Sequence, residues 1–272
     1  MMLGAITWNV APEILSITES YGIRWYGVLF AVGYLVAYWV LNALFKKEGL
    51  SVVLLDKLTL ASIIGGVVGA RLGHCIFYEP LRYLEEPLSV LYIWQGGLAS
   101  HGGAIGILIA FWIVSKRNNI SVGTSISRAM LVVPIAAFFI RLGNLTNSEI
   151  YGVPSDAPWA FVFPNSMNVV YGIEKAVPRH PTQLYEAIAY LITFIILQRY
   201  VWRTLRFHKK LSNSYISAIF LIGIFMSRFC IEFFKEPQVV FEQTMILNMG
   251  QLLSIPFFLY GIWLLVKTNR TT

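Results

Sequence analysis

Charged residues are scarce in this chain. Asp, Glu, Lys and Arg make up only 13% of the 272 residues, whereas a soluble domain carries about 25%. Hydrophobic residues reach 57%, and the mean hydropathy is +0.64. This composition excludes an ordinary soluble domain and indicates an integral membrane protein. In such a protein the net charge of +7 reflects Lys and Arg at the cytoplasmic surface, and it does not require a nucleic-acid partner.

The sequence also lacks the common signatures of metal-dependent and serine-type enzymes. Its two cysteines, Cys75 and Cys230, lie outside any CxxC or Cys/His cluster, so no metal and no cofactor is expected. There is no GxSxG, HExxH or Walker motif, and no serine or cysteine is placed as an obvious nucleophile. If the protein is an enzyme, its nucleophile comes from a substrate. The first 20 residues lack a basic stretch and an A-x-A site, so no cleaved signal peptide is expected.

Apolar stretches of membrane-spanning length recur along the chain. A helix needs about 20 apolar residues to cross the hydrocarbon core. The pattern predicts an all-α polytopic membrane protein, with residues 1–272 forming a single transmembrane domain of about seven helices. The third and fourth helices are the weakest predictions, because glycines interrupt one and the other is short. The predicted spans lie near Tyr21–Phe45, Leu58–Tyr78, Leu98–Ser115, Arg128–Gly143, Thr182–Trp202, Ser214–Phe234 and Met245–Val266.

Basic residues concentrate in alternate loops between these spans, and the opposite loops contain few of them. The positive-inside rule therefore predicts that the N-terminus lies outside and the C-terminus in the cytoplasm. The residues expected on the cytoplasmic side are Lys46, Lys47, Lys57, Lys116, Arg117, Arg128, Arg199, Arg203, Arg206, Lys209, Lys210, Lys267 and Arg270.

One loop is long enough to form a small soluble piece. Residues 148–181, between the fourth and fifth spans, are rich in Pro, Asn and aromatic residues. They predict a small extracytoplasmic head folded over the membrane surface. No internal repeat is found in the sequence, which counts against an alternating-access transporter.

Two arginines, Arg141 and Arg228, lie in the middle of apolar stretches. A charge at bilayer depth costs roughly 2.5–3.5 kcal/mol on the lenient insertion scale, so such residues usually face a polar cavity or a partner. A guanidinium keeps its charge and matches a phosphate in a bidentate fork. Arginines that meet in one membrane cavity therefore predict a site for an anionic headgroup.

Two further polar residues lie among glycines. Arg71 interrupts the glycine-dense segment 65–74, where helix packing explains the glycines but leaves the arginine unexplained. His101 has a pair of glycines on each side, which indicates a broken or tightly turned backbone. A histidine there is either a proton carrier or a hydrogen-bonded structural residue.

The remaining polar clusters each allow a structural alternative. Residues 141–152 crowd Arg141, Asn144, Asn147 and Glu149 together, and the alternative is an interfacial turn in which Glu149 neutralises Arg141. In residues 179–186 the spacing puts Gln183 and Glu186 on one helix face behind a proline, and the alternative is a plain helix start. Arg228 and Glu232 are four residues apart, and the alternative is an intrahelical ion pair.

Taken together, these segments resemble the bacterial prolipoprotein diacylglyceryl transferases over nearly the whole chain. The residues that carry the resemblance are His101-Gly102-Gly103, the run from Arg141 to Gly152, His180–Glu186, Trp25-Tyr26-Gly27, the Gly69–Gly73 segment, Arg228 with Glu232-Phe233-Phe234, and Met249-Gly250-Gln251. The resemblance implies transfer of the diacylglyceryl group of phosphatidylglycerol to the lipobox cysteine thiol of a prolipoprotein. It also implies a thioether product, released glycerol phosphate, and a site on the extracytoplasmic side of the bacterial inner membrane.

The resemblance also implies roles for individual residues. Arg141 would bind the lipid phosphate and stabilise its growing charge, and Arg228 would assist it, oriented by Glu232. His101 would take the thiol proton or fix the site through hydrogen bonds. The residues that would shape the substrate pocket are Tyr26, Asn144, Glu149, Gly152 and Arg71.

A few positions depart from the family pattern: Leu145-Thr146 follow the first asparagine, Ile224 stands where a tyrosine is common, and Lys235 replaces a late arginine. A free thiol has a pKa near 8.5, so an arginine-rich pocket alone could generate enough thiolate without a dedicated base. Two other functions stay open from the residues alone, a transporter of an anionic solute and a non-catalytic lipid-binding scaffold.

Overall fold

The computed structural model describes residues 5–16, 22–236 and 245–271. Residue 21, the predicted start of the first span, lies outside these ranges. The chain divides into two compact units. The bundle unit comprises Met1–Ala37 and Met130–Thr272, and the hairpin unit comprises Tyr38–Ala129.

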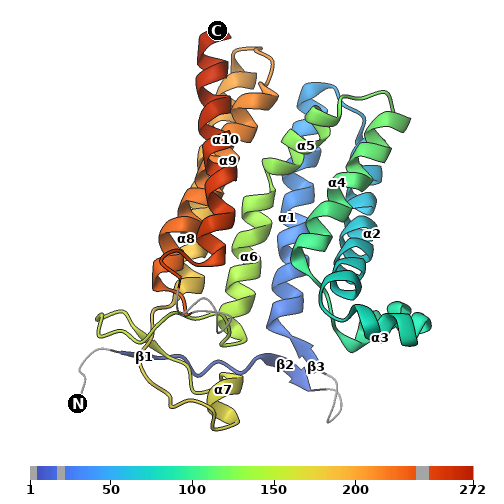
Figure 1. The fold of residues 1–272 in the computed structure, drawn as a ribbon. Helices are drawn as coiled ribbons and strands as arrows, with labels where there is room; N and C mark the ends of the chain where they lie inside the picture. Colours follow the sequence, from blue (N-terminus) through green and yellow to red (C-terminus); the bar gives the residue numbers. More distant parts are fainter. Residues whose placement is uncertain (1–4, 17–21, 237–244, 272) are drawn as a thin grey trace. The chain divides into compact units, whose positions relative to one another are not determined.

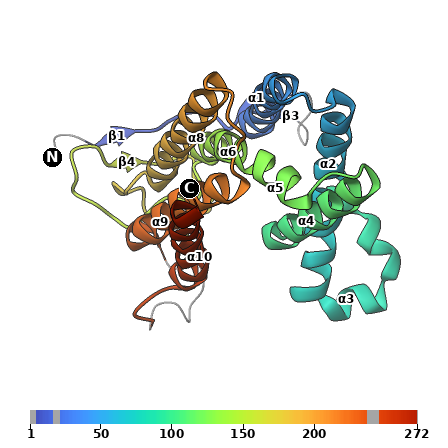
Figure 2. The same ribbon diagram turned by 90° about the horizontal axis from the view of Figure 1, so that it is seen from above.

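Four long helices form the core of the bundle unit: α6 (Val133–Thr146), α8 (Thr182–Arg206), α9 (Asn213–Ile231) and α10 (Met249–Thr271). Helix α6 packs on α8, α8 on α9, and α9 on α10 (Figures 1 and 2). The start of α10 is defined by a capping box, in which Asn248 and Gln251 each accept a hydrogen bond from the other's backbone N–H.

The first half of α1 (Trp25–Glu48) also belongs to this unit, and glycine sets how closely it approaches α6. A Cβ at Gly33 would lie 3.0 Å from the Cβ of Phe139, and one at Gly143 would lie 2.8 Å from the Tyr26 ring. The tyrosine is therefore held against the C-terminal end of α6.

The predicted head is built from the segment between α6 and α8 together with the N-terminal strand. Strand β1 (Ile6–Thr7) pairs in parallel with β4 (Phe161–Val162), and the short helix α7 (Met167–Val170) follows. Leu145, Phe161 and Phe163 form its apolar core, on which Trp8 packs. The head and the C-terminus lie at opposite ends of the bundle unit (Figure 1). A separate hairpin, β2 (Glu13–Ser16) with β3 (Gly22–Arg24), leads into α1.

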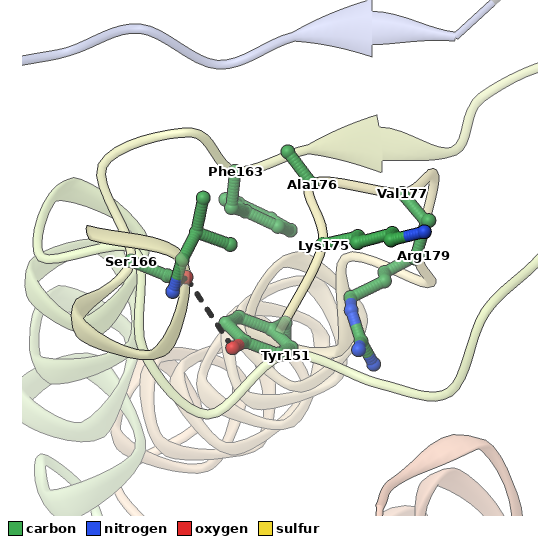
Figure 3. Close-up of a pocket in the computed structure, with 8 residues that line it drawn as sticks. Tyr151, Phe163, Ser166, Lys175, Ala176, Val177 and Arg179 are labelled. Atoms are coloured by element: carbon green, nitrogen blue, oxygen red, sulfur yellow. Dashed lines mark hydrogen bonds between the residues drawn. The ribbon is translucent and has the colours of Figure 1, made fainter. Parts of the chain in front are cut away.

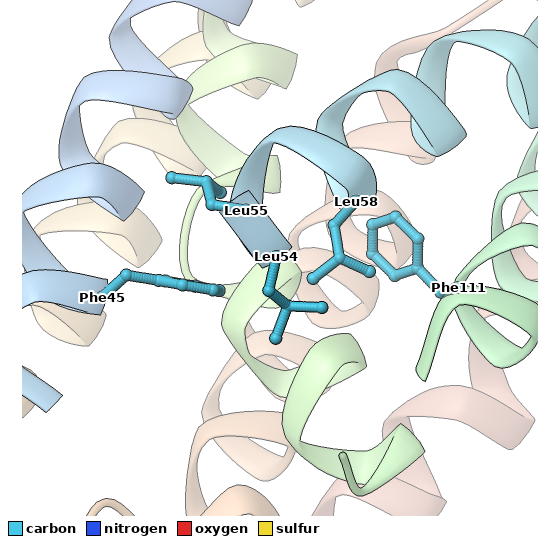
Figure 4. Packing of buried hydrophobic residues seen from close by; sticks show 5 residues of the cluster. All are labelled: Phe45, Leu54, Leu55, Leu58 and Phe111. Atoms are coloured by element: carbon cyan, nitrogen blue, oxygen red, sulfur yellow. The ribbon is translucent and has the colours of Figure 1, made fainter. Parts of the chain in front are cut away.

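The hairpin unit contains the second half of α1 together with α2 and α4, which are joined by a short helical arm. Its elements are α2 (Val52–Phe77), α3 (Pro80–Glu85), the 3-10 turns η1 (Pro87–Leu91) and η2 (Ile93–Gln95), α4 (Ser100–Arg117) and α5 (Val122–Met130). Helices α2 and α4 are in backbone contact, because a Cβ at Gly102 or Gly106 would overlap the α2 backbone. Buried side chains from α1, α2 and α4 form its apolar core: Phe45, Leu54, Leu55, Leu58 and Phe111 (Figure 4).

Each predicted span corresponds to a helix, but not every helix is a clear span. Within the described ranges, five helices are long and apolar enough to cross a membrane, namely α1, α2, α8, α9 with its extension to Phe234, and α10. The pair α5 and α6, bent by 42°, makes a sixth if it counts as one span. Helix α4 has only 18 residues, with His101 at its start and Lys116-Arg117 at its end, so its apolar part is short. The polytopic all-α class is supported, while the count of seven and the orientation stay predictions.

Candidate active site

Arg141 lies near the end of α6, in the bundle unit, with only 15% of its side chain exposed. Its Nε lies 2.5 Å from Oε2 of Glu186 on α8, and its Nη1 donates a 2.8 Å hydrogen bond to Oδ1 of Asn144. The ion partner of Arg141 is therefore Glu186. The alternative in which Glu149 neutralises Arg141 directly is wrong, because Asn144 stands between them.

Asn144 links the arginine to Glu149. It is buried, and its Nδ2 donates to Oε1 of Glu149 at 2.8 Å. Asn147 donates to the same oxygen at 3.3 Å. One amide thus presents its oxygen to Arg141 and its nitrogen to Glu149, and the carboxylate is oriented by two donors.

The chain after α6 is held in an unusual turn. Ser148 and Ile150 both adopt positive φ angles, 52° and 59°, which are uncommon outside glycine and rarer still for a β-branched residue. Gln183 Nε2 donates to the Glu149 carbonyl at 2.7 Å, and Thr182 Oγ1 donates to the Ile150 carbonyl at 2.9 Å. The start of α8 therefore stabilises the turn that presents Glu149. Such strain persists only where the surrounding structure over-determines it, and it is typical of functional sites.

A second ion-pair network lies on the other side of Glu186. This carboxylate is completely buried, and its Oε1 accepts a 2.9 Å hydrogen bond from Nζ of Lys235. Lys235 also lies 3.5 Å from Oε2 of Glu232. Sequence reasoning missed this network, because it treated Glu186 as part of a helix start and Lys235 as a departure from the family pattern. The signal was the presence of several charged residues at the ends of apolar spans, where an unpaired charge is costly.

Arg228 and Arg141 converge on one tyrosine. The hydroxyl of Tyr190, which is buried on α8, interacts electrostatically with both guanidinium groups. Glu232 makes its ion pair with Lys235 and interacts with Arg228 at longer range, since α9 ends at Ile231 and Glu232 begins the 3-10 turn η3 (Glu232–Phe234). The simple intrahelical ion pair is therefore not what the structure contains.

Two glycines set the spacing of these groups. A Cβ at Gly152 would overlap the carbonyl oxygen of Phe234, and Gly152 forms an antiparallel bridge with Lys235. A Cβ at Gly250 would lie 2.6 Å from the carboxylate carbon of Glu232. Glycine at these two positions therefore allows the turn after α6 and the start of α10 to press against the charged network.

Tyr26 completes the set on the bundle unit, because its hydroxyl interacts electrostatically with Glu149 and Arg141. The network as described contains three cations, Arg141, Arg228 and Lys235, and three carboxylates. The carboxylates are those of Glu149, Glu186 and Glu232. With all six groups ionised the cluster is formally neutral, so an incoming anion would be held by aimed guanidinium donors and not by excess positive charge.

The other predicted site residues belong to the hairpin unit. Arg71 is buried, and its guanidinium donates to four backbone carbonyls, those of Ser89, Val90, Gly96 and Gly97, at 2.6–3.3 Å. It therefore holds the arm between α2 and α4. Gly96 and Gly97 have positive φ angles of 87° and 73°, which confirms the tightly turned backbone predicted before His101.

His101 is the second residue of α4 and is exposed. Its ring stacks on Tyr78, with 5.9 Å between the centroids, and meets Phe77 edge-on. The glycine pair that follows it, Gly102-Gly103, lies within the helix and packs on α2. Within the ranges described, no group of three or more His, Cys, Asp or Glu side chains is arranged to hold a metal ion.

The head contains a separate charged cluster next to a small hollow (Figure 3). Arg179 is buried, forms ion pairs with Glu174 at 2.9 Å and with Glu236, and lies 4.9 Å over the Tyr151 ring. It also donates to the Gly152 carbonyl at 3.2 Å. The residue thus joins the head to the chain that follows α9. The hollow is lined by Tyr151, Phe163, Ser166, Val169, Lys175, Ala176, Val177 and Arg179.

Comparison with known proteins identifies the family. The profile described as "Prolipoprotein diacylglyceryl transferase" matches residues 12–267. A relative from Porphyromonas gingivalis is 42% identical over 272 residues, which cover 97% of this chain and 95% of the relative. Relatives from Tolumonas auensis and Chloroherpeton thalassium are 39% and 38% identical, each over 97% of this chain and over 97% and 95% of their own lengths. All three are named phosphatidylglycerol–prolipoprotein diacylglyceryl transferase. With that agreement over nearly its full length, the chain belongs to the prolipoprotein diacylglyceryl transferase family.

Proposed function

We propose that this transferase moves the diacylglyceryl group of phosphatidylglycerol onto the lipobox cysteine of a prolipoprotein, the first step of bacterial lipoprotein maturation. The names of its relatives support the two substrates. The observation that carries the proposal is the convergence of Arg141 and Arg228 on Tyr190 in the interior of a helical membrane protein. Paired guanidinium groups are the side chains suited to a phosphate that gains charge.

The reaction requires a thiolate and a stabilised leaving group. The cysteine sulfur attacks the glyceryl carbon that carries the phosphate. A C–S bond forms, and the bond between that carbon and the phosphate ester oxygen breaks. The bonding electrons leave with glycerol phosphate, whose phosphate changes from a diester to a more highly charged monoester. Donors aimed at those oxygens lower the barrier because they are stronger in the transition state than in the ground state.

We assign binding of the lipid phosphate to Arg141, with Arg228 assisting it. Glu232 would orient the part of the site around Arg228, and its ion pair with Lys235 holds it there. Tyr26, Asn144 and Glu149 form the surroundings of the headgroup. Gly152 contributes by leaving space for close backbone packing. Tight placement matters, since a displacement of 1 Å costs about 100-fold in rate.

Two residues of the hairpin unit take more limited roles in the proposal. Arg71 would contribute to substrate binding indirectly, through the arm whose carbonyls it holds. For His101, the role of taking the thiol proton, or of fixing the site through hydrogen bonds, rests on the family resemblance alone. Neither role depends on a metal or a cofactor.

The test is a direct product assay. Purified protein is incubated with phosphatidylglycerol and a lipobox peptide, and the peptide is weighed by mass spectrometry. We expect a gain equal to one diacylglyceryl group and an equal amount of free glycerol phosphate, with no gain on a peptide in which serine replaces the cysteine. Lipid binding without product would indicate a scaffold, and solute flux into liposomes without lipid consumption would indicate a transporter. Either result would refute the proposal.

We further propose that the protein lies in the bacterial cytoplasmic membrane with its site on the extracytoplasmic side. The positions of the head and the C-terminus, at opposite ends of the bundle unit, support opposite sides for the two. A reporter fused to the C-terminus that is active only in the cytoplasm tests the orientation. An inactive reporter on a correctly inserted fusion would overturn it.

A further inference from the structure

We infer that Glu186 and Lys235 are a positioning pair for the proposed transfer reaction, in which Lys235 holds Glu186 and Glu186 fixes the guanidinium of Arg141 toward the departing phosphate. The inference rests on the proposed function and deepens it. Neither residue was assigned a role from the sequence.

Arg141 is contacted by two partners, at two different nitrogens of its guanidinium. Its Nε faces Glu186 Oε2 at 2.5 Å, and its Nη1 faces Asn144 Oδ1 at 2.8 Å. The two contacts come from different helices: Glu186 on α8 forms a close ion pair at Nε, and Asn144 on α6 accepts a hydrogen bond from Nη1. A guanidinium held at two nitrogens by two separate segments is restricted in position, and its remaining N–H groups are left for another acceptor.

Glu186 lies in an environment where its charge needs compensation. Its side chain is completely buried, and a buried carboxylate is costly unless cations and hydrogen bonds compensate it. Lys235 supplies the second cation, at 2.9 Å from Oε1. Each carboxylate oxygen therefore has its own cation. Without Lys235, Glu186 would be paired by Arg141 alone, and that arginine would be drawn more strongly away from a phosphate.

Lys235 is itself tied to the site. Its Nζ also lies 3.5 Å from Oε2 of Glu232. Its backbone forms an antiparallel bridge with Gly152 in the turn after α6. The four side chains Arg141, Glu186, Lys235 and Glu232 alternate in charge along one path. Helix α6, helix α8 and the chain after α9 each contribute to that path, so it locks three segments around the guanidinium.

The decisive variant is Glu186→Gln, which removes the charge and keeps the shape. Lys235 retains Glu232 as its ion partner in this variant, so the fold is expected to tolerate it. We expect kcat for thioether formation to fall by about 10- to 100-fold, because a misaimed donor weakens mainly the transition state. The KM for phosphatidylglycerol should change far less than kcat. The conservative variant Lys235→Arg keeps the charge and should retain most of the wild-type kcat.

A double variant separates positioning from simple stabilisation. Lys235→Met leaves the buried Glu186 carboxylate with Arg141 as its remaining cation. This variant should lower both the melting temperature and kcat. Adding Glu186→Gln to it removes the undercompensated Glu186 carboxylate, although Glu232 still lacks its lysine, so the melting temperature should recover in part while kcat stays low. If kcat recovers together with the melting temperature, the pair is structural only and the inference is overturned.

A matched control exists in the hairpin unit. Glu48 and Arg128 form a largely buried ion pair, with both carboxylate oxygens engaged at 2.6 Å. Glu48→Gln makes the same chemical change and should lower the melting temperature without lowering kcat per folded enzyme. Wild-type protein that forms no thioether would refute the proposed function itself. Wild-type turnover with an unchanged Glu186→Gln variant would refute only the positioning pair.

Discussion

Replacing Arg141 by lysine tests most directly whether this residue binds the lipid phosphate. The substitution keeps the positive charge but removes the paired N–H donors of the guanidinium. In the structure, Arg141 reaches Glu186 and Asn144 through two different nitrogens. A single ammonium at the end of a four-carbon stem offers one point of contact, so it cannot pair with Glu186 and aim further donors at a phosphate in the same way.

The size of the effect follows from the hydrogen bonds that the lysine cannot make. A hydrogen bond to a charged group contributes about 1.5–3 kcal/mol. Each 1.36 kcal/mol of transition-state stabilisation corresponds to about tenfold in rate. Removal of one such donor therefore predicts a kcat about 10- to 150-fold lower, and removal of two donors predicts a larger decrease. Because the lysine still supplies a positive charge, binding of phosphatidylglycerol should weaken less than the chemical step slows.

The assay is the initial rate of thioether formation on a synthetic lipobox peptide, in mixed micelles of detergent and phosphatidylglycerol, followed by mass spectrometry. Arg128→Lys serves as the matched control, since Arg128 makes a comparable two-point contact with Glu48 in the hairpin unit. We expect that control to retain kcat even if it lowers the melting temperature. Turnover of Arg141→Lys at the wild-type rate would remove Arg141 from the mechanism.

Three further substitutions make separate predictions. Gly152→Ala forces a Cβ onto the Phe234 carbonyl, so thermal unfolding should show a loss of about 1–3 kcal/mol or more, and an unchanged melting temperature would contradict the described packing. Gly250→Ala places a methyl group 2.6 Å from the Glu232 carboxylate carbon, and it should reduce kcat by displacing that carboxylate from Lys235; full activity would show that Glu232 is not needed there. If His101 takes the thiol proton, His101→Gln should greatly lower turnover near neutral pH and recover part of it above the thiol pKa of about 8.5, where the substrate ionises unaided. A flat, wild-type pH profile for His101→Gln would rule out the histidine as the base.

The membrane-spanning helices could be predicted from the sequence because their signal is local. A run of about 20 apolar residues is visible without knowledge of any neighbour, and each predicted span corresponds to a helix. Residues 148–181 stand out in the sequence in the same way, as a polar and aromatic interruption. Arg141 and Arg228 were conspicuous for the same reason, since a charge in an apolar run needs an explanation wherever the chain goes.

What the tertiary structure alone decided is which charges neutralise one another. Glu186 lies 49 residues from Lys235, and its pairing depends on how α8 meets the chain after α9. For Arg71 the family resemblance implies a place in the substrate pocket, and only the fold shows that its donors reach the carbonyls of a nearby arm. Partner choice depends on burial and on packing between distant segments, and no local pattern encodes either. The sequence therefore determined that buried cations must be compensated, and only the fold determined by which residues.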